Sequence, residues 1–570
     1  MSETLIHDID VKLASCQVTD DEAHQNAALF NPDYDLTQLS MEENGVGARS
    51  RSLKERLLTA TEEDLKFLRE TLDHRIKEGR GECIYEIGLD EGGNPMGFSQ
   101  DQLVTAISTV RAAAKQANAE VALLYEKTIP LQNNPEDEAR IAYVNIRAYP
   151  KVEELLEIRV AVVGNVDAGK STLLGVLTKG ILDDGRGKAR VNLFRHKHEI
   201  ESGRTSSVGL EIMGFTADSK LIQGDPRKMT WDDICSRAAK VISYIDLAGH
   251  EKYLKTTVFG MTGCAPDFVM LMIGANAGVI GMTKEHLGIA LALSVPVYVV
   301  ITKIDMCPAN VLESTIKQLT KLLKSPGCRK IPIFVRSIED VVLTAQNFKS
   351  ERLCPIFQVS NVSGEGLDLL KNFLNILPVN GHYDINQPVE YQITDTFSVP
   401  HVGTVVSGVI MNGVVHVGDQ LLLGPDSTGQ FQPTTIKSIQ RKRVNVPMAS
   451  AGQSASFGLK KIRRAAIRKG MVMLSKTEPP PKAVFEFEAE ILVLYHSSTI
   501  NQRYQAMLHC GTVRQTVSMV SLGDRGVLRT GDRATVRFRF IRHPEFLKPG
   551  SKLVFREGRT KGVGKVVRLL

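Results

Sequence analysis

The sequence predicts an α/β domain built around a P-loop, followed by two all-β barrels and preceded by a small α+β domain. Three observations carry this prediction. An apolar, strand-like stretch at 158–163 runs directly into a glycine-rich motif that opens an apolar-periodic helical segment. Beyond Pro378 the chain changes to short apolar runs separated by glycine, which is typical of barrels. Ahead of residue 151, helical and alternating patterns are mixed, as in an α+β unit.

The composition is that of a multidomain globular chain. With 570 residues, 43% hydrophobic and 24% charged, it allows about three to five domains with sizeable cores. No apolar run reaches the roughly 18 residues of a membrane span, and the start Met1-Ser2-Glu3 lacks a signal region. Eight cysteines without a Cys-x-x-Cys pair argue against a zinc site or a disulfide framework. We therefore expect a cytoplasmic protein without a membrane partner.

The N-terminal segment 1–52 is expected to form an acidic, disordered arm. Its first 50 residues hold ten acidic side chains against two basic ones, and only two aromatics. Such a segment cannot bury enough apolar surface to offset the entropy of ordering the chain.

Residues 53–150 are predicted to form the small α+β domain. Apolar residues between 65 and 76 share one helical face, and a short strand follows at 83–87. Ser99 to Gln102 is a capping box that opens a second helix. Alternating segments at 121–125 and 142–147 supply two more strands.

Residues 151–380 are assigned to the P-loop domain, and the motif itself runs from Gly164 to Thr172. Two glycines let backbone N–H groups turn toward a β-phosphate. Lys170 would reach the β- and γ-phosphates, and the Ser171 hydroxyl would ligate Mg²⁺. The pattern predicts binding of a nucleoside triphosphate through Asn165, Val166, Asp167, Ala168, Gly169, Lys170, Ser171 and Thr172.

A second motif follows the apolar strand at 241–245 and reads Asp246-Leu247-Ala248-Gly249-His250. A carboxylate at a strand end, here Asp246, can hold the hydration shell of Mg²⁺. Gly249 can offer its backbone N–H to the γ-phosphate. The position of this motif behind a P-loop is what a GTPase requires.

The base is predicted from two further strand ends. One strand runs into Thr302-Lys303-Ile304-Asp305, where Asp305 can accept from guanine N1–H and the exocyclic amine while the Lys303 stem lies over the base. Another delivers Ser360-Asn361, a backbone donor to guanine O6. Because adenine cannot supply the donors that Asp305 needs, we expect a guanine nucleotide, GTP or GDP.

The stretches Gly164 to Thr172 and Asp246 to Tyr253 resemble translational GTPases of the elongation factor Tu superfamily. Gly203 to Gly209, the Thr302-Lys303-Ile304-Asp305 motif and the extra N-terminal region together resemble the GTP-binding protein 1 family within it. The resemblance covers roughly residues 60 to 570 and implies an α/β P-loop GTPase domain followed by two barrels.

Switch I departs from the elongation factor pattern. Elongation factors carry Arg-Gly-Ile-Thr, whose Thr ligates Mg²⁺, whereas this chain reads Arg204-Thr205-Ser206-Ser207. The register from Arg204 indicates Ser207 as the metal ligand, together with Ser171 and Asp246. The distance from Arg204 to the next shared feature, Gly214-Phe215, is longer than in elongation factors. Thr205 and Ser206 therefore stay as alternatives.

Other departures concern the base and the P-loop. Thr302 replaces the usual Asn, so the contact to guanine N7 is in question. Asn165 replaces a common His, which should be harmless because the P-loop acts there through its backbone. Val166 matches one wing of the family's hydrophobic gate, and the other wing has no counterpart.

The resemblance also implies a catalytic residue. His250 corresponds to the histidine that positions the attacking water, a role that suits the loose transition state of phosphoryl transfer. A lone histidine would otherwise be read as structural. Asp167 has two readings, a contact to a monovalent cation that replaces an arginine finger or a purely structural role in the P-loop.

Residues 381–478 and 482–570 are predicted to form the two barrels, and they resemble domains II and III of elongation factors. Residues 482–570 contain 16 Lys or Arg against 7 Asp or Glu, a net charge of +9 where the whole chain has +6. Clustered positive charge fits a phosphate-backbone partner. A solvated basic face would look the same.

Two functions are compatible with these features. The first is a GTP-hydrolysing translational GTPase that binds aminoacyl-tRNA, the ribosome or both in a GTP-switched manner. The second is a GTPase adaptor that recruits RNA-turnover or translation quality-control machinery, with its N-terminal region as the docking element. The GTPase subunit of sulfate activation shares the three-domain plan but fits the switch I sequence poorly.

Overall fold

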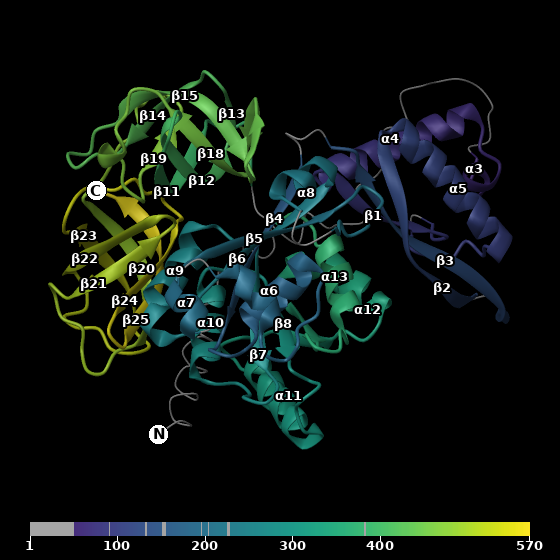
Figure 1. Cartoon of the computed structure of the whole chain (residues 1–570), viewed down its shortest axis with the longest axis horizontal. Coiled ribbons are helices and arrows are strands. Elements are labelled where there is room, and N and C mark those ends of the chain that lie inside the picture. The colour runs from purple at the N-terminus through teal and green to yellow at the C-terminus, as the bar shows by residue number, and fades with distance from the viewer. Residues whose placement is uncertain are drawn as a thin grey trace.

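The computed structural model describes residues 51–570 apart from 91, 132–133, 151–154, 195–196, 203–204, 225–228 and 381–382. Figure 1 shows three parts around a central α/β body: two barrels lie on one side and an N-terminal unit on the other. The predicted acidic arm falls on residues that lie outside the described ones, except for its last two. No helix in the described part is long and apolar enough to cross a membrane.

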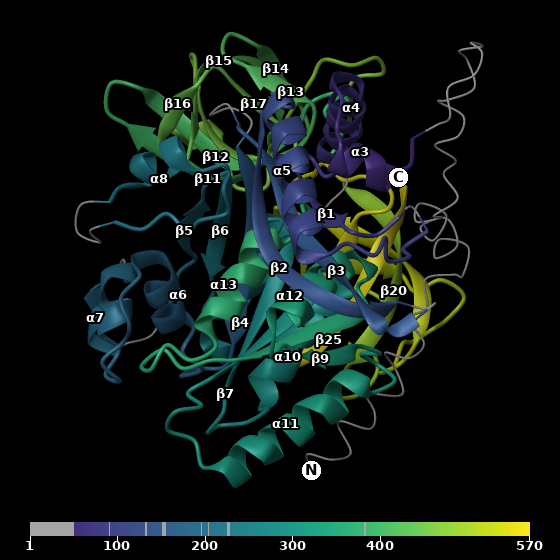
Figure 2. The ribbon, with the colours of Figure 1, turned by 90° about the vertical axis from the view of Figure 1, so that its right-hand side faces the viewer.

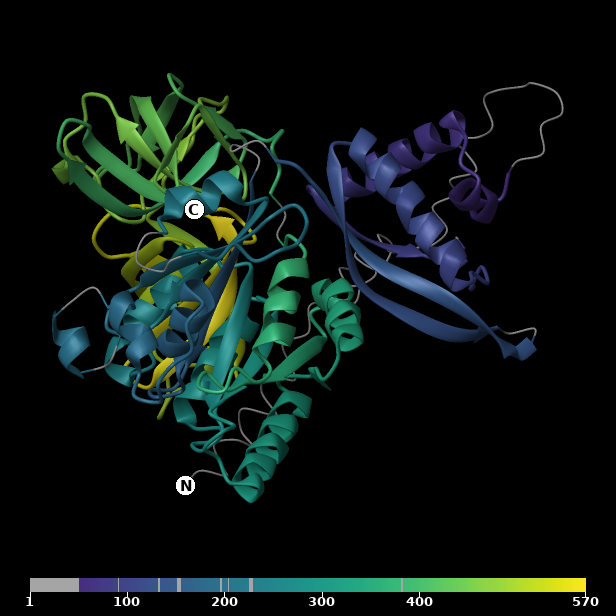
Figure 3. The same ribbon diagram turned by 45° about the vertical axis from the view of Figure 1, so that its right-hand side comes forward.

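The N-terminal unit is an α+β domain in which helices pack on one β-sheet. Its helices are α3 (Leu53–Leu58), α4 (Glu62–Glu78) and α5 (Gln100–Gln116), and its strands are β1 (Glu82–Ile87), β2 (Ala119–Leu131) and β3 (Asn134–Ala148). Ser99 and Gln102 form the predicted capping box at the start of α5. The apolar faces of α4 and α5 pack on an antiparallel sheet of order β1-β3-β2, whose long β2–β3 hairpin reaches away from the body (Figure 3).

A buried ionic cluster fixes this unit to the central body. The Glu82 carboxylate pairs with the Arg147 guanidinium at 2.7 Å and with Lys240 of the body, and the last two side chains are fully buried. Lys240 also donates to the carbonyls of Asn375 and Leu377, at 2.7 and 2.6 Å. Because every charge in the cluster has a partner, the unit and the body share one polar core.

The central body is a doubly wound sheet of order β5-β6-β4-β7-β8-β10-β9. Only β5 runs antiparallel to its neighbour. Every residue of β4, β6, β7 and β8 is buried, because helices cover both faces. The strands are β4 (Leu156–Gly164), β5 (Gly209–Phe215), β6 (Lys240–Asp246), β7 (Phe268–Gly274), β8 (Val297–Thr302), β9 (Ile331–Phe334) and β10 (Leu353–Gln358).

The helices divide between the two faces of this sheet (Figure 2). On one face lie α6 (Lys170–Lys179), α12 (Ile338–Gln346) and α13 (Leu367–Ile376), and on the other α9 (Leu254–Gly263), α10 (Gly281–Ala292) and α11 (Ala309–Lys324). Shorter elements are η4 (Lys188–Leu193), α7 (Lys197–Ser202), α8 (Trp231–Arg237), η5 (Glu251–Tyr253) and η6 (Phe348–Ser350). The arrangement brings the carboxyl ends of β4, β6, β8 and β10 to one edge, where ligands bind in such folds.

Two barrels complete the chain, as predicted. In the first, β14-β19-β11-β12-β18-β15 close through pairing of β14 with β15; in the second, the closed order is β20-β23-β22-β21-β24-β25. The first contains β11 (Glu390–Val399), β12 (Gly403–Asn412), β13 (Val414–His416), β14 (Gln420–Gly424), β15 (Gln432–Arg441), β16 (Val444–Val446), β17 (Met448–Ser450), β18 (Ser454–Leu459), η7 (Arg464–Ala466) and β19 (Val472–Leu474). The second contains β20 (Glu486–Tyr495), β21 (Gln505–Cys510), β22 (Val513–Ser521), β23 (Arg533–Phe540), β24 (Lys552–Glu557) and β25 (Thr560–Leu569).

Each barrel is joined to the body by a carboxylate, which is buried at Glu157 and partly buried at Glu285. Glu157, at the start of β4, pairs with Lys442 of the first barrel at 2.7 Å and lies 3.8 Å from Arg441. Glu285 of α10 pairs with Arg556 and, at 2.6 Å, with Lys561 of the second barrel. The fold class predicted from the sequence, an α/β P-loop domain with an α+β unit before it and two barrels after it, is confirmed.

Candidate functional site

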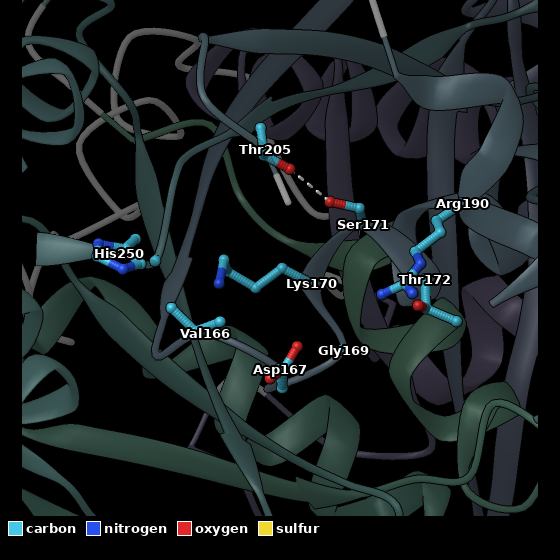
Figure 4. A pocket seen from close by; sticks show the side chains of 10 residues that line it. Val166, Asp167, Gly169, Lys170, Ser171, Thr172, Arg190, Thr205 and His250 are labelled. Atoms are coloured by element: carbon cyan, nitrogen blue, oxygen red, sulfur yellow. Dashed lines mark hydrogen bonds between the residues drawn. The ribbon is translucent and has the colours of Figure 1, made fainter. Parts of the chain in front are cut away.

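The P-loop forms the floor of a pocket at the carboxyl edge of the sheet (Figure 4). Its backbone depends on three unusual conformations: φ is 147° at Gly164, 61° at Asp167 and 78° at Gly169. A Cβ on Gly164 would lie 2.3 Å from the carbonyl oxygen of Met272, so the position requires glycine. Gly169 caps α6 without a side-chain hydrogen bond, which leaves the first N–H groups of the helix directed at the pocket.

Lys170 crosses the centre of this loop. Its ammonium donates to the carbonyl oxygens of Gly164 and Asn165, at 3.2 and 2.7 Å. Burial lowers the pKa of Lys170 to about 8, against the attraction of Asp246 and Asp167. The cation is thus held where an anion between the loop and the switch segments would meet it.

Three side-chain oxygens converge beside Lys170. The Ser171 hydroxyl donates to Asp246 Oδ2 at 2.7 Å, and Thr205 Oγ1 lies 2.9 Å from Ser171 Oγ and 3.4 Å from Asp246 Oδ2. Burial raises the pKa of Asp246, and its Oδ1 is buried without a partner among the described residues. A carboxylate and two hydroxyls are hard oxygen donors, so this group fits Mg²⁺, and the unpartnered oxygen could receive one of its waters.

Switch I places Ser207 elsewhere. Glu199 of α7 accepts hydrogen bonds from the backbone N–H groups of Ser206 and Ser207, at 2.7 and 3.2 Å, and from both hydroxyls, at 2.7 and 3.3 Å. The register from Arg204 had indicated Ser207 as the metal ligand, and the structure instead brings the alternative, Thr205, to Ser171 and Asp246. The cause is the buried Glu199 carboxylate, which turns the two serines away from the pocket.

The segment Asp246 to Tyr253, here called switch II, forms the opposite wall. Gly249 is buried so closely against the P-loop that an added Cβ would lie 2.4 Å from Lys170 Nζ and 2.7 Å from Gly164 O. The next residue, His250, lines the pocket at one end (Figure 4). Its Nδ1 accepts from the Lys252 N–H at 3.1 Å, and its ring meets Tyr253 edge to face. These contacts orient the imidazole at the mouth of the site.

The base motif is tied to the P-loop from behind. The buried Thr302 hydroxyl donates to the carbonyl oxygen of Ala168 at 2.9 Å. The Thr302 hydroxyl is therefore engaged within the protein, at the position where elongation factors have Asn. Lys303 follows with φ of 63°, and Asp305 is exposed at the end of the motif.

The second base loop follows β10. The Ser360 N–H donates to Glu365 O at 3.0 Å, and its Oγ accepts from the Val362 and Ser363 N–H groups. Ser360 thus shapes the loop, and Asn361 is the member of the pair whose side chain lies near Gly169. Its carbonyl oxygen accepts from the Asp183 N–H at 2.8 Å.

Two residues of the site had no signal in the sequence analysis. His286 of α10 is fully buried, and its Nδ1 accepts from the Gly164 N–H at 3.1 Å. Burial lowers the pKa of His286 to about 3, so the ring is neutral and can accept. Arg190 of η4 lines the pocket. Both come from segments without a recognisable motif, and only the folded arrangement reveals them.

Comparisons with known proteins agree with this geometry. The family described as Elongation factor Tu GTP binding domain matches residues 157–379, and Elongation factor Tu domain 2 matches residues 403–474. GTP-binding protein 1 of Xenopus laevis is 55% identical over 517 residues, 90% of this chain and 78% of the relative. GTP-binding protein 2 of Homo sapiens is 46% identical over 498 residues, 86% of this chain and 82% of the relative.

Solved structures show the same fold at lower identity. The elongation factor SelB of Methanococcus maripaludis in complex with the GTP analogue GppNHp has a TM-score of 0.52 at 20% identity, covering 73% of this chain and 80% of the other. The bacterial selenocysteine-specific elongation factor EF-Sec has a TM-score of 0.53 at 19% identity over 72% of this chain, which spans only 58% of that longer chain. On the strength of the two close relatives, the chain belongs to the GTP-binding protein 1 family of elongation-factor-Tu-like translational GTPases.

Proposed function

We propose that this protein binds GTP with Mg²⁺, hydrolyses it to GDP and phosphate, and acts in the cytoplasm as a translational GTPase. The observation that carries the proposal is the pocket formed where the segments after β4 and β6 meet. There the P-loop cation Lys170, the Ser171–Asp246–Thr205 oxygens and the buried Gly249 surround the space for a triphosphate tail.

In this proposal the nucleotide contacts are divided among the strand ends. The P-loop residues Asn165 to Thr172 bind the phosphates through backbone N–H groups and Lys170. Asp305 reads the guanine edge, the Lys303 stem covers the ring, and Asn361 offers a donor to O6. Thr302 and Ser360 act by holding the two base loops in place, which their buried hydrogen bonds support.

The proposed metal ligands are Ser171 and Thr205, with Asp246 holding the ion directly or through its waters. Bound Mg²⁺ would supply neutralisation of the charge on the β- and γ-phosphates. Thr205 is preferred to Ser207 because its hydroxyl already lies within 3.4 Å of both other oxygen ligands.

His250 is proposed to orient the attacking water at the γ-phosphate end of the pocket. Its place at the end of the pocket and its oriented ring support this role. Asp167 lines the same pocket, where it could hold a monovalent cation, and its positive φ supports an equal part in shaping the loop.

The test of the proposed chemistry separates binding from hydrolysis. Equilibrium titration should show GTP and GDP binding and no comparable ATP binding. His250→Ala should leave GTP affinity near that of the unchanged protein and slow single-turnover hydrolysis by about tenfold or more. Equal affinity for ATP and GTP, or an unchanged rate in His250→Ala with ribosomes present, would refute the respective role.

For partners, we propose aminoacyl-tRNA, the ribosome or both, recognised in the GTP form. The two barrels with their excess of Lys and Arg support this, and SelB and EF-Sec, which share the fold, are named as elongation factors. Filter binding of charged and uncharged tRNA, with GDP and with a non-hydrolysable GTP analogue, tests it. Affinity should fall with salt by a log–log slope of about −0.7 to −0.9 per phosphate contacted.

The second candidate is a GTPase adaptor in RNA turnover or translation quality control. One observation favours it: the N-terminal unit is held on the body by the Glu82–Arg147–Lys240 cluster and presents its long hairpin away from the nucleotide pocket. If charged tRNA binds no better than uncharged tRNA and the nucleotide makes no difference, the adaptor becomes the better account.

A further inference from the structure

A guanidinium projects into the nucleotide pocket from a segment that no motif covers. Arg190 belongs to η4, which follows α6 and precedes switch I. Figure 4 draws it on the side of Thr172, at the opposite end of the pocket from His250. Within the described part of the chain no carboxylate forms an ion pair with this side chain, and the guanidinium lines the pocket.

The segment that carries Arg190 is firmly anchored. The Asp183 carboxylate accepts from the N–H groups of Gly185, Gly187 and Ala189, at 3.1, 3.0 and 2.9 Å. The backbone of η4 lies directly on α6, since a Cβ on Gly175 would be 2.1 Å from the Ala189 carbonyl oxygen. These bonds make η4 an extension of the P-loop helix.

Asp183, which holds this segment in place, also contacts the loop that contains Ser360 and Asn361. The Asp183 N–H donates to the carbonyl oxygen of Asn361 at 2.8 Å. Gly187 lies under the Arg190 guanidinium, because a Cβ there would come within 2.6 Å of Arg190 Nε. None of these contacts involves Thr205 or Gly249, the residues that would sense a γ-phosphate.

The position of Arg190 along the pocket indicates which phosphate group of the nucleotide it would contact. Lys170 and His250 mark the β- and γ-phosphate end, and the phosphates of a nucleotide run back from there to the α-phosphate beside the ribose. Arg190 lies at that other end. A guanidinium binds phosphate oxygens through paired, charge-assisted hydrogen bonds.

We propose that Arg190 binds the α-phosphate of the guanine nucleotide and so contributes to the affinity for GDP and GTP alike. This rests on the proposed binding of guanine nucleotides. It makes Arg190 a binding residue of the ground state. An arginine acting on the γ-phosphate would instead change the rate of hydrolysis.

The experiment measures GDP and GppNHp affinity for the full chain carrying Arg190→Ala, Arg190→Lys or Arg186→Ala. Arg186 is the matched control, an exposed arginine of the same loop that does not line the pocket. We expect Arg190→Ala to weaken both nucleotides by a similar factor of about 10 to 100, as for a lost hydrogen bond between charged groups. Arg190→Lys should lose less, and Arg186→Ala should change little.

Two further measurements make the result decisive. Single-turnover hydrolysis at saturating GTP should be unchanged in Arg190→Ala, and its nucleotide-free melting temperature should match the unchanged protein. Loss of GppNHp affinity alone, a slower saturated rate, or no change in either affinity would overturn the inference. If the unchanged protein bound neither nucleotide, the proposed function itself would fail, which is a distinguishable outcome.

Discussion

Gly249→Ala tests the close contact between switch II and the P-loop. The added Cβ would lie 2.4 Å from Lys170 Nζ and 2.7 Å from both the Asn165 carbonyl carbon and the Gly164 oxygen. The lysine end could swing aside. The two backbone atoms belong to a loop fixed by strand β4 and helix α6, so the clash must move switch II instead.

The magnitude follows from this overlap. Forcing one methyl group into a closely packed site costs about 1–3 kcal/mol. Switch II must approach the P-loop when its N–H contacts a γ-phosphate, whereas GDP has none to offer. We therefore expect GppNHp affinity to fall by about 5- to 150-fold relative to GDP affinity, which is the same free energy expressed as a ratio.

Calorimetric titration of both nucleotides measures the ratio. Gly288→Ala, in α10, is the matched control because a Cβ there has open space around it. Equal losses for GDP and GppNHp would mean that the approach of Gly249 does not depend on the γ-phosphate. No loss at all would mean that the observed packing is irrelevant to nucleotide binding.

Thr205→Ala should raise the Mg²⁺ concentration needed for half-maximal hydrolysis by about tenfold or more, as for a lost contact to a charged group, while Ser207→Ala changes it little; the reverse order would restore Ser207 as the ligand. Asp305→Asn should weaken GTP by about 1.5–3 kcal/mol and favour xanthosine triphosphate in competition binding. Burial opposes ionisation of Glu157, but Lys442, Arg441 and Arg159 lower its pKa to about 2, from an ordinary value of 4.5. This stabilisation is about 3 kcal/mol; it is present above pH 4.5 and is lost as the pH falls through about 2. Glu157→Gln should therefore lower the free energy of unfolding at pH 7 by about that amount. An equal denaturation midpoint for the variant and the unchanged protein would contradict this expectation.

Much of the fold and of the site is local in sequence and could be predicted. An apolar strand followed by the P-loop, and another followed by Asp246, each specify their own strand end, and parallel strands bring those ends together. The capping box at Ser99 is similarly local. These features depend on residues within a few positions of one another.

Other features depend on contacts between distant segments. The proposed preference for Thr205 over Ser207 depends on Glu199 of α7, whose carboxylate accepts from the Ser206 and Ser207 hydroxyls. The Thr302 hydroxyl donates to the Ala168 carbonyl oxygen, 134 positions earlier. No periodicity or spacing encodes such pairings, so the sequence leaves them open.

The ion pairs between the barrels and the central body limit which segments can move when a nucleotide binds. Glu157 and Glu285 join the barrels to the body, and undocking a barrel carries the cost of breaking its ion pair. The γ-phosphate would have to outweigh that cost in each pair to undock a barrel. At the pocket, Thr205 makes hydroxyl contacts and Gly249 makes backbone contacts. A bound phosphate with its metal can replace each of these contacts. We therefore expect the switch segments to respond first, with the barrels following only through the elements they share with the site.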